Sequence, residues 1–213
     1  MPPYVFIIDE INRGEISKIF GELFFSIDPG YRGLNGIVAT QYQNLIPKEK
    51  DTDFDPNDAD VFRNGFYVPD NVYIIGTMND IDRSVESMDF AMRRRFAWHE
   101  VSAKDSKSML YNKDAWWPEL MPDEQVIKDI EKRMGKLNDC ILKIQGLSSA
   151  YQIGAAYFLK LKNYLNNGNV TDDSWDKLWK NHLNGLLFEY LRGLPNADEE
   201  LKELKNAYNT DTN

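Results

Sequence analysis

The order of apolar and polar positions predicts an α/β part followed by an all-helical part. Residues 4–8 form a continuous apolar run closed by two carboxylates, which is typical of a strand buried on both faces of a parallel sheet. A second run of this kind covers 72–75, and 96–101 predicts a third short strand. We therefore expect an α/β fold built on parallel strands.

Between the first two strands the apolar spacing changes to that of a helix. Apolar residues recur at helical spacing over 16–27, and the Asp-Pro-Gly sequence at 28–30 stops the pattern. Glycines and prolines then interrupt 31–70, which also contains an acidic run at 51–60. We expect an excursion with a short β-hairpin there, and the acidic run lacks the ligand spacing of an EF-hand.

Helical periodicity dominates from residue 123 onward. The predicted helical stretches are 126–141, 157–165, 175–190 and 198–208. We divide the chain into a partial α/β core at 1–102, a linker at 103–122 and a helical lid at 123–213.

Composition narrows the functional classes. The 213 residues are 42% hydrophobic, which is enough for a real core, and 34 acidic against 25 basic residues give a net charge of -9. This balance excludes an overall basic footprint for DNA, so any DNA is expected to bind through regions outside this chain. One cysteine excludes a disulfide framework or a zinc cluster. No apolar run is long enough to span a bilayer, and we expect a cytoplasmic protein without a membrane partner.

Two adjacent carboxylates, Asp9 and Glu10, follow the first strand. The carboxyl ends of parallel strands are where open α/β folds place their ligands. Mg²⁺ prefers oxygen ligands, so Asp9 would hold Mg²⁺ through water and Glu10 would polarise an attacking water. The alternative is that both residues only cap the helix that follows, where negative charge is favourable.

The second strand ends in a polar sequence, Gly76-Thr77-Met78-Asn79. From this neighbouring edge Asn79 could reach the terminal phosphate of a nucleotide. Glycine and asparagine also suit an ordinary turn, which is the alternative. Taken together, the two strand ends predict one crevice.

Three consecutive arginines, 93–95, stand out in an acidic chain. Guanidinium groups bind phosphate at two points, and an arginine from a neighbouring subunit can stabilise charge on a transferring phosphoryl group. The alternative is a solvated basic patch at the end of a short helix, favourable to the helix dipole.

These blocks, in this order, resemble the McrB-like AAA+ family over nearly the whole chain. Residues 4–13 resemble its Walker B strand, and 73–79 resemble its sensor 1 strand. Residues 82–84 and 89–96 resemble the block that leads into the arginine finger. Residues 151–158 and 179–191 resemble helices of the family's lid.

The resemblance implies roles for residues around a bound nucleotide. Asp9 would bind Mg²⁺, with water between them, and Glu10 would serve hydrolysis. Asn79 would sense phosphate, and Asp82 and Arg83 would lie near the nucleotide of the same subunit. The implied cofactor is Mg²⁺ with ATP or GTP.

The resemblance also implies an assembly. Arg94 is our choice for the finger that reaches the next subunit, with Arg95 as the fallback. The implied partners are further copies in a homo-oligomeric ring, such as a hexamer, and an endonuclease subunit. Asp80 stands where the best-known members have a small neutral residue, which leaves the choice of ATP or GTP open.

The sequence contains no Gly-x-x-x-x-Gly-Lys-Ser/Thr loop to hold the β- and γ-phosphates. We therefore expect an incomplete AAA+ sheet, with Walker B and sensor 1 strands but no P-loop strand, and a P-loop encoded upstream. An open strand edge invites pairing, so these residues alone should rearrange or dimerise.

Two hypotheses follow for function. In the first, the chain is the C-terminal part of an NTP-hydrolysing ring motor, related to a DNA restriction or DNA-translocating system and inactive alone. In the second, it is a non-catalytic scaffold or interaction module derived from an AAA+ subunit. The motor hypothesis is favoured, because the chain contains four candidate site residues together: Asp9, Glu10, Asn79 and Arg94.

Overall fold

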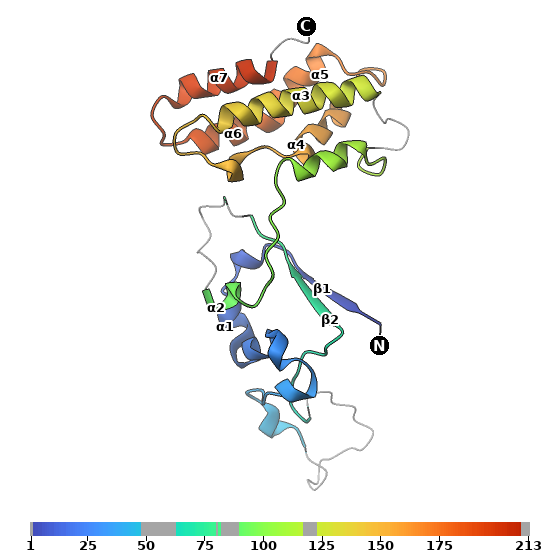
Figure 1. The fold of residues 1–213 in the computed structure, drawn as a ribbon, viewed down its shortest axis with the longest axis vertical. Helices are drawn as coiled ribbons and strands as arrows, with labels where there is room; N and C mark the ends of the chain where they lie inside the picture. The colour runs from blue at the N-terminus through green and yellow to red at the C-terminus, as the bar shows by residue number, and fades with distance from the viewer. Residues whose placement is uncertain (1, 48–62, 80, 82–89, 117–122, 210–213) are drawn as a thin grey trace. The chain divides into compact units, whose positions relative to one another are not determined.

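The computed structural model describes residues 2–47, 63–79, 81, 90–116 and 123–209. The chain divides into two compact units, residues 1–98 and 99–213. Each unit folds around its own cluster of buried apolar side chains. Figure 1 shows the strands in the first unit and the longest helices in the second. Among the residues described, the second unit contains helices, joined by loops and one isolated bridge between Asn166 and Asn169.

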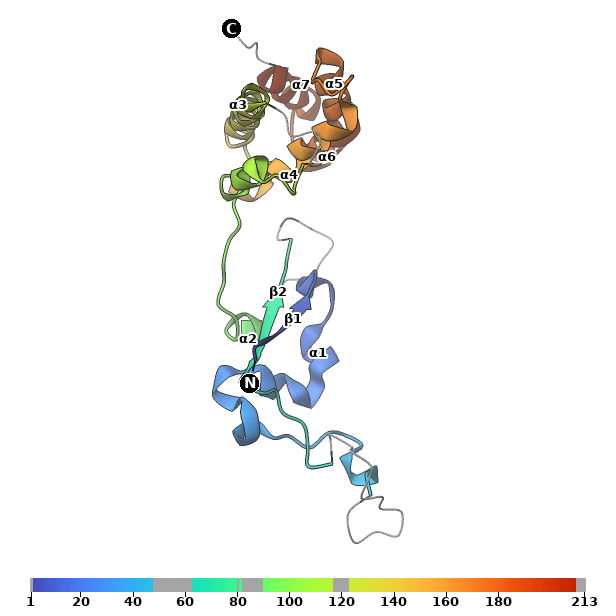
Figure 2. The same ribbon diagram turned by 90° about the vertical axis from the view of Figure 1, so that its right-hand side faces the viewer.

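The sheet of the first unit pairs β1 (Tyr4–Ile8) with β2 (Val72–Gly76). The strands are parallel, with Tyr4 opposite Val72 and Ile8 opposite Gly76, and they lie side by side in Figure 2. The predicted parallel α/β arrangement is thus confirmed for these two strands. The predicted third strand at 96–101 is wrong, because that segment pairs with neither described strand and an extended segment needs a hydrogen-bonded neighbour.

The two strands are more exposed than their sequence predicts. Residues 4–7 were expected to be buried on both faces, but their side chains are 55–64% exposed. On β2, Val72 and Ile74 pack against the core of the unit, whereas Tyr73 and Ile75 remain at least half exposed. On β2 the burial alternates because the core of the unit contacts one face of the strand, whereas on β1 both faces are exposed from Tyr4 to Ile7 and only Ile8 packs against that core.

The helical layer of the first unit is short and irregular. Helix α1 (Ile16–Phe20) is followed by a 3₁₀ helix over Gly21–Ile27, so helical structure covers the predicted range 16–27 but is interrupted at Gly21, where φ is +50° and ψ is -126°. Glycine adopts this left-handed φ without a steric cost. Helix α2 covers Phe90–Arg93, and further 3₁₀ turns cover Ile11–Arg13, Pro29–Tyr31, Gly33–Gly36 and Gln43–Leu45. The core of this layer is Ile11, Ile27, Val68 and Met92.

The excursion between the strands shows one antiparallel bridge, between Val38 and Phe66, where a hairpin was expected. The acidic run at 51–60 lies outside the described residues.

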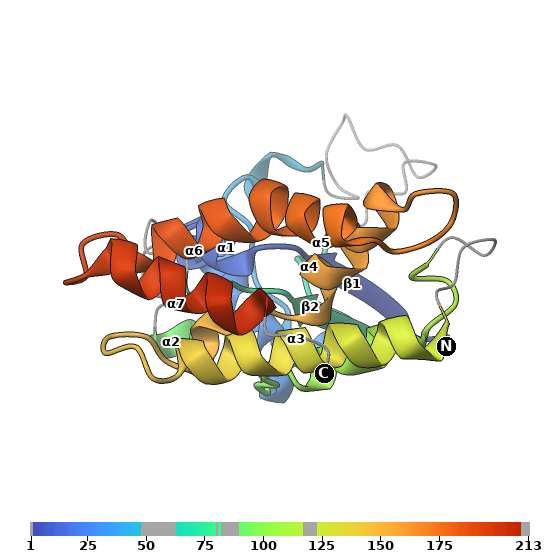
Figure 3. The same cartoon turned by 90° about the horizontal axis from the view of Figure 1, so that it is seen from above.

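The second unit confirms the helical periodicity that begins at residue 123. Its longest helix, α3 (Glu124–Ile141), starts at Asp123, whose side chain accepts a hydrogen bond from the Val126 N–H at 2.9 Å. Helix α7 (Ala197–Asn209) runs alongside α3, as Figure 3 shows. The remaining elements are α4 (Ala155–Phe158), α5 (Asp172–Leu178), a π-helical turn (Trp179–Leu183), α6 (Asn184–Leu191) and 3₁₀ turns at Ser149–Tyr151 and Leu159–Tyr164.

Part of the expected linker is packed in the second unit. A 3₁₀ helix covers Asp105–Tyr111, and Leu110 and Trp116 are fully buried in the helical core. The Trp116 indole N–H donates to the Leu110 carbonyl at 2.8 Å, which gives this buried polar group a partner. Within the part of the chain that the structure describes, no helix is long and apolar enough to cross a membrane.

Candidate functional site

The two strand ends are joined by one side chain, Thr77. Its hydroxyl donates to Oδ1 of Asp9 and accepts a hydrogen bond from the Glu10 backbone N–H at 3.0 Å. The Thr77 main chain bonds to the same loop, with its N–H to the Ile8 carbonyl at 3.0 Å and its carbonyl to the Ile11 N–H at 2.9 Å. The parallel pairing thus brings the predicted carboxylates beside the end of β2, as expected.

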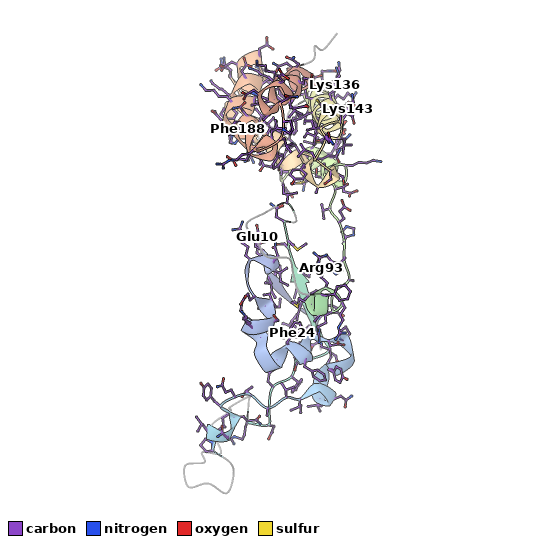
Figure 4. The ribbon with its side chains drawn as sticks, turned by 90° about the vertical axis from the view of Figure 1, so that its left-hand side faces the viewer. Glu10, Phe24, Arg93, Lys136, Lys143 and Phe188 are labelled. Carbon is purple, nitrogen blue, oxygen red and sulfur yellow. The ribbon has the colours of Figure 1, made fainter. Side chains whose placement is uncertain are left out.

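Glu10 has an unusual backbone conformation. Its φ of 53° and ψ of 49° place it in the left-handed region, which a residue with a Cβ rarely adopts. Its side chain forms no cap on the following turn, so the capping alternative is not seen for Glu10. Its Oε2 lies 3.4 Å from Nε of Arg13. Backbone strain of this kind is concentrated at functional sites, and Figure 4 shows Glu10 at the end of β1.

Asn79 lies at the end of β2 and is exposed. Its Oδ1 accepts a hydrogen bond from the Ile81 N–H at 3.4 Å, which is the side-chain turn that the alternative interpretation predicted. Its backbone carbonyl accepts from Nδ2 of Asn12 at 3.4 Å, so the loops after the two strands are connected a second time. The Asn12 contact keeps the Asn79 backbone beside the loop that carries Asp9 and Glu10.

The three arginines after α2 differ sharply in their surroundings. Only 8% of the Arg95 side chain is exposed, and its guanidinium lies over the Phe24 ring at 4.2 Å. It donates to the Ala91 carbonyl at 2.5 Å, and its Nε is 3.8 Å from Oδ2 of Asp28. Arg95 is therefore held inside its own unit; Figure 4 shows Phe24 in the helical layer of that unit.

Arg93 and Arg94 point outward from the same segment. Both are exposed, and the Arg93 guanidinium lies 5.2 Å from the centre of the Trp98 ring. Across the described ranges, no hydrogen bond or ion pair involves the Arg94 guanidinium. The predicted residues Asp82 and Arg83 lie outside the described residues.

The donor set at the strand ends suits one kind of metal binding. Among the residues described there is no group of three or more His, Cys, Asp or Glu side chains that could enclose a metal ion. Mg²⁺ commonly keeps several waters and is held by one or two carboxylates together with substrate phosphates. Asp9 and Glu10 fit that arrangement, and they do not fit a cage built by the protein alone.

Two polar residues of the site, Thr77 and Asn12, had no role predicted from their sequence positions. Thr77 was part of the polar sequence that closes β2, yet no role followed from its type. Asn12 lies in the segment after the carboxylates and bonds across to Asn79. A polar residue next to each predicted strand end is the signal that could have identified both.

Comparisons with known proteins find one matching family and related restriction proteins. The family described as AAA domain (dynein-related subfamily) matches residues 2–96. The Type IV methyl-directed restriction enzyme EcoKMcrB subunit of Escherichia coli strain K12 is 34% identical over 177 residues, which is 81% of this chain and 33% of that protein. The Type II restriction enzyme BsuMI component YdiS of Bacillus subtilis strain 168 is 26% identical over 119 residues, 53% of this chain and 30% of that protein. The chain thus spans about a third of the length of the curated relatives that it matches.

Proposed function

We propose, on the premise that this chain belongs to the McrB-like AAA+ proteins, that it forms the hydrolytic part of an NTP-driven ring motor in a DNA restriction or DNA-translocating system. The observation that carries the proposal is the strand-end site. Two carboxylates after β1 and Asn79 after β2 lie on one edge of a parallel sheet, and Thr77 joins the two ends.

Each residue of the site has a proposed role in hydrolysis. Asp9 holds Mg²⁺ through water, and the ion, when bound, neutralises charge on the phosphate oxygens. Glu10 orients and polarises the attacking water. Asn79 contacts the terminal phosphate, and Asp82 and Arg83 lie near the nucleotide of their own subunit. The nucleotide is ATP or GTP.

The site is completed by a neighbouring copy of the chain. Arg94 reaches the nucleotide of the next subunit in a homo-oligomeric ring, such as a hexamer, and stabilises the transferring phosphoryl group. Its exposure supports this choice, whereas Arg95 is tied to Phe24 and Asp28 within its own unit. An endonuclease subunit and DNA, bound through regions outside this chain, are the proposed further partners.

The 213 residues do not contain the P-loop motif, and we propose that they do not hydrolyse nucleotide without it. The second candidate, a non-catalytic scaffold, does not explain the strained backbone at Glu10. A scaffold has no use for a left-handed glutamate that is hydrogen-bonded to the adjacent strand end. This feature favours the motor.

The test is a Glu10→Gln variant in the ring-forming protein with its P-loop present. We expect nucleotide binding to be retained and turnover to fall about 10²- to 10⁴-fold, because a positioned general base is lost. Glu15→Gln is the matched control, since Glu15 is also acidic but pairs with Lys18 on the surface. Turnover that is absent from the native protein with both ATP and GTP supports the scaffold, and full turnover in Glu10→Gln contradicts the proposed role.

A further inference from the structure

We infer that Thr77 is a positioning residue, which sets the geometry of both site carboxylates through a single hydroxyl; the inference rests on the proposed hydrolytic function. The hydroxyl acts both as a hydrogen-bond donor and as a hydrogen-bond acceptor. It donates to Oδ1 of Asp9 and accepts from the N–H of Glu10. Two consecutive residues with different proposed tasks therefore share one anchor on the neighbouring strand.

The position of this hydroxyl is set by strand pairing. The Thr77 N–H donates to the Ile8 carbonyl at 3.0 Å, and the Thr77 carbonyl accepts from the Ile11 N–H at 2.9 Å. These bonds hold the threonine backbone on both sides of the loop that carries the carboxylates. A β-branched side chain also has few χ1 rotamers, so its oxygen is held in place before a ligand arrives.

The bond to the Glu10 amide holds a conformation that the chain otherwise avoids. Glu10 has a φ of 53°, and a left-handed backbone is unfavourable for a residue with a Cβ. The N–H of Glu10 points at Thr77 in this conformation. Without the hydroxyl, we expect Glu10 to relax toward a right-handed or extended backbone, which moves its carboxylate away from the strand end.

The hydrogen bond from Thr77 to Asp9 affects the proposed role of Asp9 in holding Mg²⁺. Because Oδ1 accepts from Thr77, the carboxylate rotates less, and its second oxygen, Oδ2, would be the one to hold Mg²⁺ through water. Groups that orient ligand side chains through a second hydrogen bond commonly change metal affinity or activity by about 10- to 100-fold when removed. Thr77 orients the Asp9 carboxylate through a hydrogen bond of this kind.

The test compares Thr77→Val, which keeps the shape but removes the hydroxyl, with Thr77→Ser, which keeps the hydroxyl. In the full protein with its P-loop, we expect Thr77→Val to lower kcat about 10- to 100-fold with little change in the Kd for nucleotide. We expect Thr77→Ser to restore kcat to within about threefold of the native value. A purely structural role would lower kcat and nucleotide binding together.

A second readout does not depend on turnover. Hydrogen exchange of the peptide that contains the Glu10 amide should be faster in Thr77→Val than in the native protein and unchanged in Thr77→Ser, because only the valine lacks the acceptor. Native kcat and native exchange in Thr77→Val overturn the inference. If Thr77→Val does not fold, a folded Thr77→Ser with low kcat overturns it, and one with native kcat and exchange supports it.

The Glu10→Gln variant separates the two proposals. If the native protein turns over neither ATP nor GTP, the proposed function fails whatever Thr77 does, and if Glu10→Gln retains turnover, the proposed role of Glu10 fails. If Glu10→Gln loses turnover while Thr77→Val keeps native kcat and exchange, only the role of Thr77 fails.

Discussion

Alanine substitutions of Arg94 and Arg95 should affect different properties, because the two side chains have different surroundings. Arg95→Ala should lower stability, and Arg94→Ala should lower turnover. Arg95 loses a contact with Phe24 at 4.2 Å and a hydrogen bond to the Ala91 carbonyl at 2.5 Å. A desolvated cation–π contact and a charged hydrogen bond together are worth about 2 to 4 kcal/mol. The ion pair with Asp28, at 3.8 Å, adds little. Arg95→Ala should therefore lower the free energy of unfolding of the first unit by about 2 to 4 kcal/mol.

Arg94→Ala should leave stability within about 0.5 kcal/mol of the native value, because the side chain is exposed and makes no described bond. It should lower turnover in the ring on the order of 10³-fold, as expected for loss of an arginine finger. Denaturant unfolding measures the first quantity, and steady-state hydrolysis by the assembled protein measures the second.

Mixing experiments test whether Arg94 acts on a neighbouring subunit. Subunits with Arg94→Ala should regain hydrolysis when mixed with Glu10→Gln subunits, because an interface between the two variants can combine an intact glutamate with an intact finger. Absence of any recovery, despite mixed rings, refutes action between subunits. A native unfolding midpoint in Arg95→Ala together with lost turnover refutes the assignment of Arg95 to the core and makes it the finger.

Three further predictions concern the helical unit. Asn138→Ala should cost about 2 to 4 kcal/mol in urea unfolding, because Asn138 accepts from the buried Ile153 N–H at 2.7 Å and donates to its carbonyl at 3.0 Å. Arg133→Lys should cost about 1 to 2 kcal/mol in the same assay, since the planar guanidinium stacks over Trp175 at 4.4 Å and an ammonium does not replace it. Burial, and then a nearby lysine charge, lowers the pKa of His182 below its ordinary value of 6.5. The unfolded chain then binds the proton first, so stability should be complete above about pH 6.5 and fall as the pH decreases from there toward the lowered pKa.

The two substitution predictions for the helical unit have matched controls. Asp139→Ala changes an exposed neighbour of Asn138, and Lys136→Arg reverses the Arg133 exchange at a position without that stacking; both should remain within about 0.5 kcal/mol of native. For the pH prediction the comparison is with the native protein, since His182→Gln should flatten the pH dependence near 6.5. An unchanged pH profile in His182→Gln contradicts the assignment.

The strand-end site could be predicted from the sequence to the level of its main residues. An apolar run closed by carboxylates and a second run closed by a polar sequence were enough to place Asp9 and Asn79 at one edge, because parallel strands bring their carboxyl ends together. The arginine finger was harder to identify from the sequence than the residues at the strand ends. Three identical side chains stand in a row, so the choice of Arg94, with Arg95 as the fallback, rested on the family resemblance, and only the structure shows that Arg94 is exposed and Arg95 largely buried.

The sequence by itself determined the order of elements, the parallel pair of strands and the helical periodicity after residue 123, and it supplied the candidate site residues. Only the tertiary structure decided which side chains are buried and which residue joins the site. Thr77 forms a hydrogen bond with Glu10, which lies 67 positions away in the chain. The guanidinium of Arg95 packs on the ring of Phe24, which belongs to a separate element. Periodicity is a local property, whereas burial and hydrogen-bond partners depend on segments that only the fold brings together.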